Sequence, residues 1–189
     1  QIALWENYPP GVLIFVVDDG SSKYPAFDIL KDLYFPYGVD IQLWRCTRDL
    51  GFNGHGCRNL AATYAPTEPI MFLDIDITLN PCDVGHLRRL QHAYGRVGKF
   101  SMYREYEKGW EPYPGHLNCF ITTKETFWDA GGYDESFVGL HTGDRDFHEA
   151  LAKVSSPVNL GCSLTLHRGG RGVTVDPYRV TKGMPITYD

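Results

Sequence analysis

Residues 12–21 have the sequence Val-Leu-Ile-Phe-Val-Val-Asp-Asp-Gly-Ser, and this stretch decides the expected fold. Six apolar residues, most of them branched, stop abruptly at two carboxylates and a glycine. This pattern is typical of a parallel strand that is buried on both faces and ends in a loop. A second apolar run, residues 69–73, ends in the same way at Asp74 and Asp76. Because open α/β sheets bind ligands beyond the carboxyl ends of their strands, both acidic clusters are expected at a binding site.

Strand-like and helix-like segments alternate along the chain. Helical spacing at 26–33 is followed by an extended segment at 40–45, and a glycine-rich turn leads into a helix at 54–64. The alternation predicts an α/β fold with a central, mostly parallel sheet flanked by helices. Further along, the sequence predicts helices at 82–94, 124–130 and 144–154, strands at 99–103 and 118–122, and a loop at 105–116.

The composition excludes some partners. With 18 basic and 23 acidic residues the net charge is −5, so we expect no nucleic-acid partner. No apolar run is long enough for a membrane span, and the N-terminus lacks the pattern of a signal peptide. The five cysteines contain no Cys-x-x-Cys pair, so neither a disulfide framework nor a zinc site is indicated. We therefore expect a soluble protein of the cytoplasm.

The two acidic clusters suggest different tasks. Alternation along an extended segment points Asp74 and Asp76 the same way, at a spacing that suits a shared divalent cation and a ribose. Carboxylates together with phosphate oxygens favour Mg²⁺ or Mn²⁺, whereas the plainer alternative is a pair of solvated side chains. Asp18 and Asp19 are placed to accept hydrogen bonds from a base or a ribose, or else simply to form an Asp-Gly turn.

A glycine-rich segment follows the second predicted strand. Residues 51–62 offer backbone amides at a helix start together with the guanidinium of Arg58. Such a combination suits a diphosphate or the edge of a nucleobase. An ordinary flexible turn is the alternative.

Taken in order, these motifs resemble one enzyme family. VVDDGS (16–21), NGHGCRNLAA (53–62), FLDID (72–76), GGYDESF (131–137) and the later Asp144 are similar to the inverting GT-A-fold glycosyltransferases of the family 2 type. The resemblance covers nearly the whole chain. It implies one Rossmann-like GT-A domain over 1–189, in which about 1–78 bind the nucleotide sugar and about 79–189 carry the acceptor and catalytic half. The family's usual first strand, expected before residues 2–8, is missing from this N-terminus.

The resemblance also implies roles for the donor side. The donor is expected to be a UDP-sugar, with GDP- or dTDP-sugars as alternatives, and the cofactor Mn²⁺ or Mg²⁺. The implied residues are Asp18, Asp19, Asn53, Arg58 and Asp74 for the nucleotide, Asp74, Asp76 and His167 for the metal, and Arg168 and Arg171 for a loop over the diphosphate.

On the acceptor side, Asp144 is implied as the general base that deprotonates a hydroxyl of a glycan or another acceptor. An aspartate with an ordinary pKa near 3.9 is ionised at neutral pH, as a base must be. Gly143 stands where the family commonly has Glu, so Asp134 or Glu135 is expected to supply the orienting carboxylate. Aromatic rings stack well on sugars, which makes Trp110, Tyr113 and His116 the expected acceptor contacts.

Two other functions fit parts of the sequence. Asp74-Ile75-Asp76-Ile77-Thr78 also matches the DxDxT motif of haloacid-dehalogenase-like phosphatases, although about 70 residues with two ligand-binding motifs precede it here. A non-catalytic domain that binds sugar nucleotides is supported only by the glycine at position 143. In that case Asp144 would have no role, because binding alone needs no base.

Overall fold

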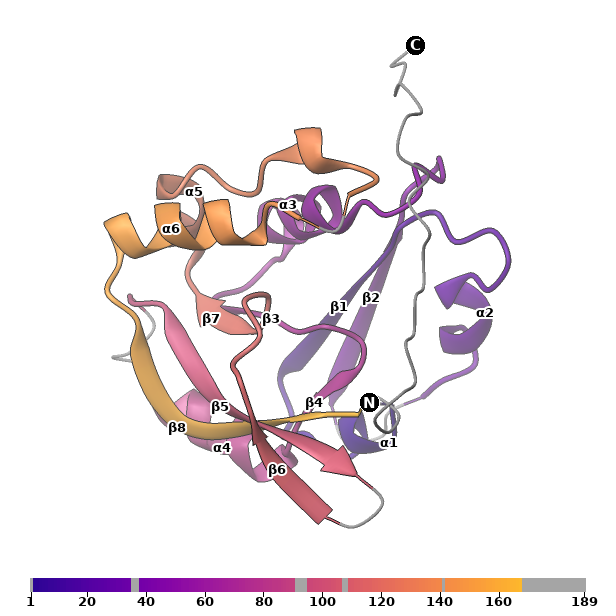
Figure 1. Cartoon of the computed structure of the whole chain (residues 1–189). Helices are drawn as coiled ribbons and strands as arrows, with labels where there is room; N and C mark the ends of the chain where they lie inside the picture. Colours follow the sequence, from indigo (N-terminus) through magenta and orange to yellow (C-terminus); the bar gives the residue numbers. More distant parts are fainter. Residues whose placement is uncertain (1, 35–37, 91–94, 107–108, 141, 168–189) are drawn as a thin grey trace.

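The computed structural model describes residues 2–34, 38–90, 95–106, 109–140 and 142–167 (Figure 1). Helices and strands alternate along most of this part of the chain. In order, the elements are α1 (Ile2–Trp5), β1 (Val12–Asp18), α2 (Ala26–Leu30), β2 (Val39–Arg45), α3 (Gly54–Tyr64), β3 (Ile70–Phe72), β4 (Ile77–Leu79), α4 (Pro81–Arg89), β5 (Gly98–Tyr106), β6 (Gly109–Tyr113), β7 (Phe120–Thr122), α5 (Lys124–Asp129), the 3-10 helix η2 (Glu135–Phe137), α6 (Asp144–Val154) and β8 (Val158–Leu166).

The first two strands form a parallel pair. Their register runs from Val12 opposite Val39 to Asp18 opposite Arg45, so both strands end at the same edge. The connection from β1 to β2 contains α2, which a parallel pair needs because the chain must return to its starting end. Helix α3 packs against β1. The residues that follow each strand, Asp19 and Cys46, therefore emerge side by side next to α3.

The remaining strands form a six-stranded sheet in the order β3-β7-β5-β8-β4, with β6 paired to β5. Among the ladders of this sheet in the described residues, β5–β8 is parallel and the other four are antiparallel. The α/β class is confirmed, but the expectation of mostly parallel strands is correct only for the N-terminal pair. The physical reason is connectivity: β5 and β6 form a hairpin, and a direct hairpin connection reverses the chain.

Strand β6 lies where the sequence predicts a loop, so that prediction is wrong for 109–113. The sequence does not indicate this strand because it contains Gly109 and Pro112, and both residue types are uncommon in sheet interiors. Among the described residues, β6 is an edge strand that pairs only with β5, with Pro112 opposite Tyr103. An edge strand tolerates proline because one side of it needs no ladder hydrogen bond.

The core has two parts. One lies between the larger sheet and helices α1 and α4, and includes Trp5, Leu87 and Leu164. The other is mainly aromatic and is covered by α3, α5 and α6, which lie together along one side of the molecule in Figure 1. Its members include Phe127, which is completely buried, and Tyr133, whose ring centroid stacks 4.0 Å from that of Phe147. Because Tyr133 belongs to this second cluster, the cluster anchors the GGYDESF segment (131–137) to the core.

The longest helices in the described part of the chain, α3 and α6, have 11 residues each. None of the described helices is long and apolar enough to cross a membrane.

Candidate functional site

Asp18 shapes the loop after β1. It is 4% exposed, and its two carboxylate oxygens accept hydrogen bonds from the backbone amides of Ser21 and Ala26, each at 2.7 Å. Burial raises the pKa of Asp18, but these hydrogen bonds outweigh burial and hold the pKa below its ordinary value. The carboxylate therefore fixes the path of residues 19–25, and its contact with a nucleotide stays a prediction.

Asp19 joins the same loop to α3. Its Oδ2 atom accepts a 2.7 Å hydrogen bond from the backbone amide of Asn53, and burial raises the pKa of Asp19. The side chain of Asn53 caps α3 by accepting from the amide of Gly56 at 3.2 Å. Two residues implied for the nucleotide are thus in direct contact, and they hold the start of α3 against the end of β1.

Arg58 connects two of the other predicted residues, Asp74 and Asp144. Its Nη2 atom donates to Asp74 Oδ1 at 2.8 Å, and its Nη1 atom lies 3.9 Å from Asp144 Oδ1. Nη1 is buried and makes no hydrogen bond within the described residues. The guanidinium also lies 5.4 Å from the ring centroid of Tyr133. Nη1 is therefore a buried donor without a hydrogen bond in the described part of the chain, beside Asp144, while Nη2 is held by Asp74.

His55 is a site residue that the sequence reasoning missed. It is 3% exposed, with Nδ1 at 2.8 Å from the backbone oxygen of Asp134 and Nε2 at 3.2 Å from Asp144 Oδ1. Because a carbonyl oxygen can only accept, the ring donates through Nδ1 in the first contact, and Nε2 is the nitrogen that faces the carboxylate of Asp144. The signal available in the sequence was spacing, since His55 and Arg58 are three residues apart and share one face of α3.

Gly143 lies at a backbone position that favours glycine. It precedes α6 with φ +89°, a left-handed conformation that favours glycine. A Cβ atom there would lie 2.6 Å from Cε1 of His55 and 2.7 Å from Cδ2 of Phe137. A larger side chain would push His55 away from Asp144, which is the first residue of α6.

The residues implied for the metal are neighbours, but their side chains are engaged with other groups. Asp74 Oδ2 lies 3.2 Å from His116 Nδ1. The backbone amide of His167 donates to the backbone oxygen of Asp76 at 2.9 Å, as expected from the pairing of β4 with β8. The ring of His167 contacts Glu105 Oε2 through Nδ1 and Thr78 Oγ1 through Nε2, both at 2.7 Å.

The donor types suit Mn²⁺ or Mg²⁺, because carboxylate oxygens with at most one imidazole are ligands that these ions accept. His167 must leave Glu105 or Thr78 to serve as a ligand. Among the described residues, only two groups of three or more His, Cys, Asp or Glu residues have donor atoms that all lie within 4.8 Å of one another. They are Asp74 with His116 and Cys119, and Asp19 with Cys46 and Cys57.

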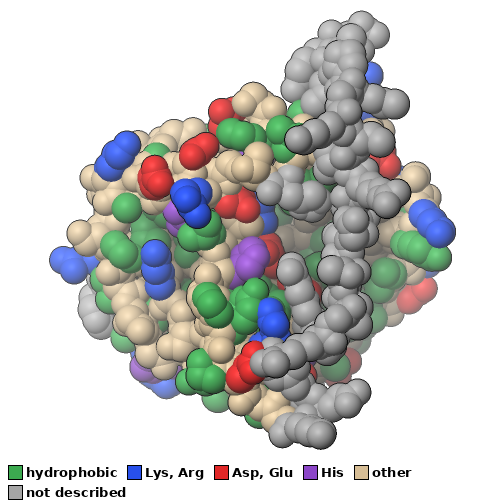
Figure 2. All heavy atoms as spheres, in the orientation of Figure 1, with side chains coloured by type: hydrophobic (Ala, Val, Ile, Leu, Met, Phe, Trp, Pro, Cys, Tyr) green, Lys and Arg blue, Asp and Glu red, His purple; other side chains and the backbone are tan. Residues whose placement is uncertain are grey.

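The residues expected to meet the acceptor are divided between two places. Trp110, which is 58% exposed, and Tyr113 lie on β6, and the register sets Trp110 opposite Glu105, the residue that holds His167. His116 lies against Asp74, closer to the donor residues than expected. Histidine and acidic side chains gather near the middle of the face shown in Figure 2, between the helices and the β5–β6 hairpin.

Asp134 and Glu135 are used by the fold. Asp134 Oδ1 accepts from the amide of Ser136 at 2.9 Å, and hydrogen bonds from the hydroxyl and the amide of Ser136 lower the pKa of Asp134. Glu135 Oε1 accepts from Asn59 Nδ2 at 2.9 Å, and the role of either residue as an orienting carboxylate stays a prediction. Arg168 and Arg171 lie outside the described residues.

Comparison with known proteins identifies the fold. No family model and no curated protein matches the sequence. The structure is similar to that of GalNAc-T7 with UDP, GalNAc and Mn²⁺, with a TM-score of 0.60. The chain has a GT-A-like fold. The two sequences are 14% identical, and the similarity covers 83% of this chain and 38% of that chain. The chain thus spans well under half the length of GalNAc-T7.

Within the GT-A-like fold, Arg58 is the centre of the site. It reaches Asp74 after β3 and approaches Asp144 on α6, while His55 from the same helix contacts Asp144. The arrangement offers a fixed cation, a carboxylate that can accept a proton, and further carboxylates nearby for a metal.

Proposed function

We propose that this chain is the catalytic domain of a metal-dependent glycosyltransferase that moves a sugar from a UDP-sugar to an acceptor hydroxyl with inversion. The observation that carries the proposal is the bridge made by Arg58 from Asp74 to Asp144. It brings the implied donor residue and the implied base to one point. The GT-A-like fold supports the same reading, because its structural neighbour was solved with UDP, GalNAc and Mn²⁺.

On the donor side, Asp19 and Asn53 contact the base and the ribose, as does Asp74, and Arg58 binds the diphosphate. Asp18 contributes mainly by holding the loop that carries Asp19. Nη1 of Arg58 is the atom best placed for a phosphate oxygen, since it is buried and makes no hydrogen bond within the described residues. Arg168 and Arg171 remain candidates for closing over the diphosphate.

Asp74 and Asp76 would hold Mn²⁺ or Mg²⁺, with His167 as a further ligand. When bound, such an ion stabilises the negative charge of the leaving diphosphate. Either Thr78 or Glu105 would keep its contact with the ring of His167 and orient it, while the other would give up its ring nitrogen to the ion. The β4–β8 ladder keeps His167 beside Asp76.

Asp144 removes the proton from the acceptor hydroxyl, which then attacks the sugar opposite the leaving diphosphate. Oδ1 of Asp144 faces His55 and Arg58, so the other carboxylate oxygen is the one that accepts the proton. Both partners are on α3, which fixes the carboxylate relative to the donor and so favours the reaction by positioning. A glycan or another hydroxyl compound lies against Trp110, Tyr113 and His116.

A non-catalytic domain that binds sugar nucleotides is the second candidate, favoured by Gly143. A phosphatase that uses Asp74 and Asp76 has less support, because Asp74 Oδ1 is held by Arg58 and the fold is GT-A-like. Turnover of a UDP-sugar separates the first candidate from the binding domain, and hydrolysis of a phosphomonoester identifies the phosphatase.

The proposal is tested by calorimetric titration with UDP, GDP and dTDP, each with and without Mn²⁺. A Kd for UDP that is at least about tenfold lower with Mn²⁺ than without it supports the donor site. That factor corresponds to about 1.4 kcal/mol of binding free energy. If GDP or dTDP binds more tightly than UDP, the proposed nucleobase is wrong but the proposed transfer reaction stands. If none of the three nucleotides binds, the transferase proposal fails.

A further inference from the structure

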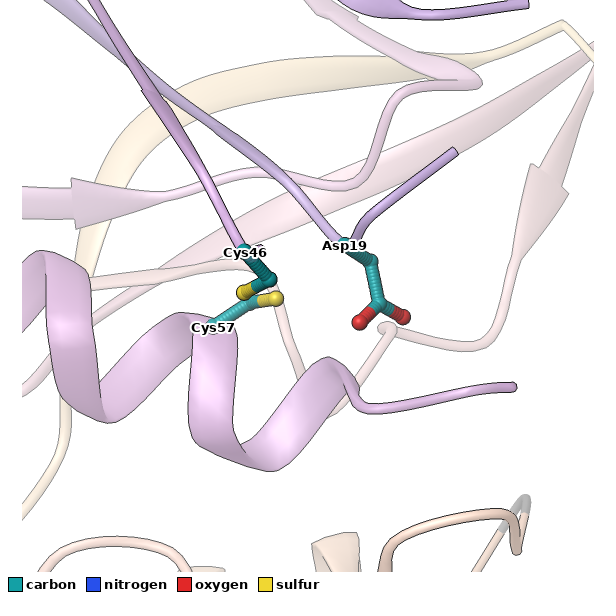
Figure 3. Close-up of side chains that lie close together, drawn as sticks. All are labelled: Asp19, Cys46 and Cys57. Carbon is teal, nitrogen blue, oxygen red and sulfur yellow. The ribbon is translucent and has the colours of Figure 1, made fainter. Parts of the chain in front are cut away.

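Two cysteines that are eleven positions apart come together beside Asp19 (Figure 3). Cys46 directly follows β2, Cys57 lies in the first turns of α3, and Asp19 directly follows β1. The parallel pairing of β1 and β2 brings the first two positions to one sheet edge, and the packing of α3 on β1 adds the third. In Figure 3 the two sulfur atoms lie next to each other, with the carboxylate of Asp19 to one side.

The three side chains form a compact set of ligand atoms. One atom from each, two Sγ and one carboxylate oxygen, lies within 4.8 Å of the other two. A tetrahedral Zn²⁺ site has donors about 3.3–3.8 Å apart, given Zn–S and Zn–O distances of about 2.3 and 2.1 Å. Only small side-chain adjustments are needed to bring this set to that spacing.

The state of Asp19 points to a ligand. Its Oδ2 atom is fixed by the amide of Asn53, whereas Oδ1 is buried and has no ordinary hydrogen-bond partner among the described residues. The Cys57 thiol, which is a weak donor, also lies against the Asp19 carboxylate. The amide of Asn53 plays the part of an outer hydrogen bond that orients a metal-binding carboxylate.

We propose that Asp19, Cys46 and Cys57 bind a thiophilic divalent cation such as Zn²⁺, with a fourth position open to water or another ligand. Thiolates select zinc over magnesium and manganese, so this site differs in chemistry from the Asp74–Asp76 pair. Both thiols lose their protons to solvent when the cation binds, and a dication replaces them between two thiolates and one carboxylate. Burial and the nearby Asp19 carboxylate keep the Cys57 thiol protonated in the absence of a cation, since both raise its pKa.

The site is tested by titrating the fully reduced protein with Cd²⁺ while recording the near-ultraviolet absorption of cadmium–thiolate bonds, followed by competition with Zn²⁺. We expect one equivalent to bind, release of protons on binding, and tighter binding as the pH rises. The substitutions Cys46→Ser and Cys57→Ser should each weaken binding at least about 100-fold, and Asp19→Asn should weaken it about tenfold or more.

Cys82→Ser is the matched control, because Cys82 is an exposed free cysteine on α4. Its variant should bind Cd²⁺ like the wild type. Circular dichroism checks that each variant is folded. The proposal is overturned if the reduced wild type shows no cadmium–thiolate absorption, or if that absorption survives in the Cys46→Ser/Cys57→Ser double variant. Neither readout depends on the proposed transferase activity.

Discussion

Two basic side chains from α3, Arg58 and His55, contact Asp144. Arg58 and His55 approach the same carboxylate oxygen, because Arg58 Nη1 lies 3.9 Å and His55 Nε2 lies 3.2 Å from Asp144 Oδ1. The backbone oxygen of Asp134 fixes the other ring nitrogen, so His55 cannot turn without losing a buried hydrogen bond. His55 is therefore a positioning residue for Asp144 in the proposed reaction.

Replacing Asp144 with Asn separates binding from transfer. The amide cannot accept the acceptor's proton, so the rate of sugar transfer should fall by about 10²–10⁴-fold. The affinity for UDP should change less than about threefold, because the proposed base does not itself contact the nucleotide and the amide keeps an oxygen beside Arg58. Transfer is measured by UDP release with an acceptor found on a glycan panel, and binding by calorimetry. Asp146→Asn, on the exposed face of the same helix, is the control. Equal losses of rate and UDP affinity would contradict the assignment of the base.

His148 should make the stability of the fold depend on pH. Burial lowers the pKa of His148 to about 4, with a further contribution from Lys99, as its ring packs edge-on to Phe120 and Phe147. An unfolded histidine has a pKa near 6.5. The neutral ring thus stabilises the fold fully above about pH 6.5, and this contribution is lost as the pH falls toward 4.

Thermal unfolding between pH 7.5 and 4.5 checks this dependence. The melting temperature should fall on acidification in the wild type, and it should fall less in a His148→Phe variant, which carries no titratable group there. A variant whose melting temperature falls as steeply as that of the wild type would show that other groups carry the acid sensitivity.

The sequence predicted most elements because apolar runs and helical spacing are local signals. β1, β2, α3 and α6 lie within one residue of their predicted bounds. Strand direction was not predictable in the larger sheet, since the alternation of side chains is the same in parallel and antiparallel ladders. Nor did the sequence indicate the contacts of His55 or the approach of Cys46 to Cys57, because both arise from packing between segments far apart in the chain.

The steric requirement for glycine at position 143, before α6, can be tested with Gly139 as the matched control, because both glycines have positive φ. Gly143 (φ +89°) would place a Cβ atom 2.6 Å from His55, whereas Gly139 (φ +80°) has nothing within 4 Å of that position. Gly139→Ala should lower the free energy of unfolding by about 1 kcal/mol, which is the cost of placing a Cβ atom on a backbone with positive φ. Gly143→Ala should lose that and a further 1–3 kcal/mol or so from overpacking against His55 and Phe137.

Urea unfolding measures both variants. The difference between them isolates the steric effect, and the Gly143→Ala protein should also transfer sugar more slowly, because His55 no longer positions Asp144. Equal destabilisation by the two substitutions would mean that the turn relaxes and that Gly143 is not required by His55.

Helix α3 joins the two sheets of the protein. It packs on β1 and also contacts α5 and η2, so the loop after β1, the end of β3 and the start of α6 all meet along it. The predicted division near residue 78 falls within β4, which pairs with β8 from the end of the described chain. Donor and acceptor functions are thus expected to share one rigid support, and the boundary between them stays a prediction.

Two kinds of cation should act in opposite ways on nucleotide binding. Mn²⁺ at Asp74 and Asp76 is expected to strengthen the binding of UDP, because it neutralises the diphosphate. Zn²⁺ at Asp19, Cys46 and Cys57 is expected to weaken it about 10- to 100-fold, since it occupies the carboxylate proposed to contact the base or ribose, and hydrogen bonds to charged groups contribute about 1.5–3 kcal/mol.

Calorimetric titration of UDP with and without one equivalent of Zn²⁺, at constant Mn²⁺, measures this competition. Weakening in the wild type that disappears in the Cys46→Ser/Cys57→Ser variant places the competition at Asp19. Weakening that is equal in both proteins would mean that Zn²⁺ displaces Mn²⁺ from the carboxylates after β3. If Zn²⁺ binds to the thiols but UDP affinity does not change, then Asp19 does not contact the nucleotide, and the donor must be held by Arg58 and Asp74 without it.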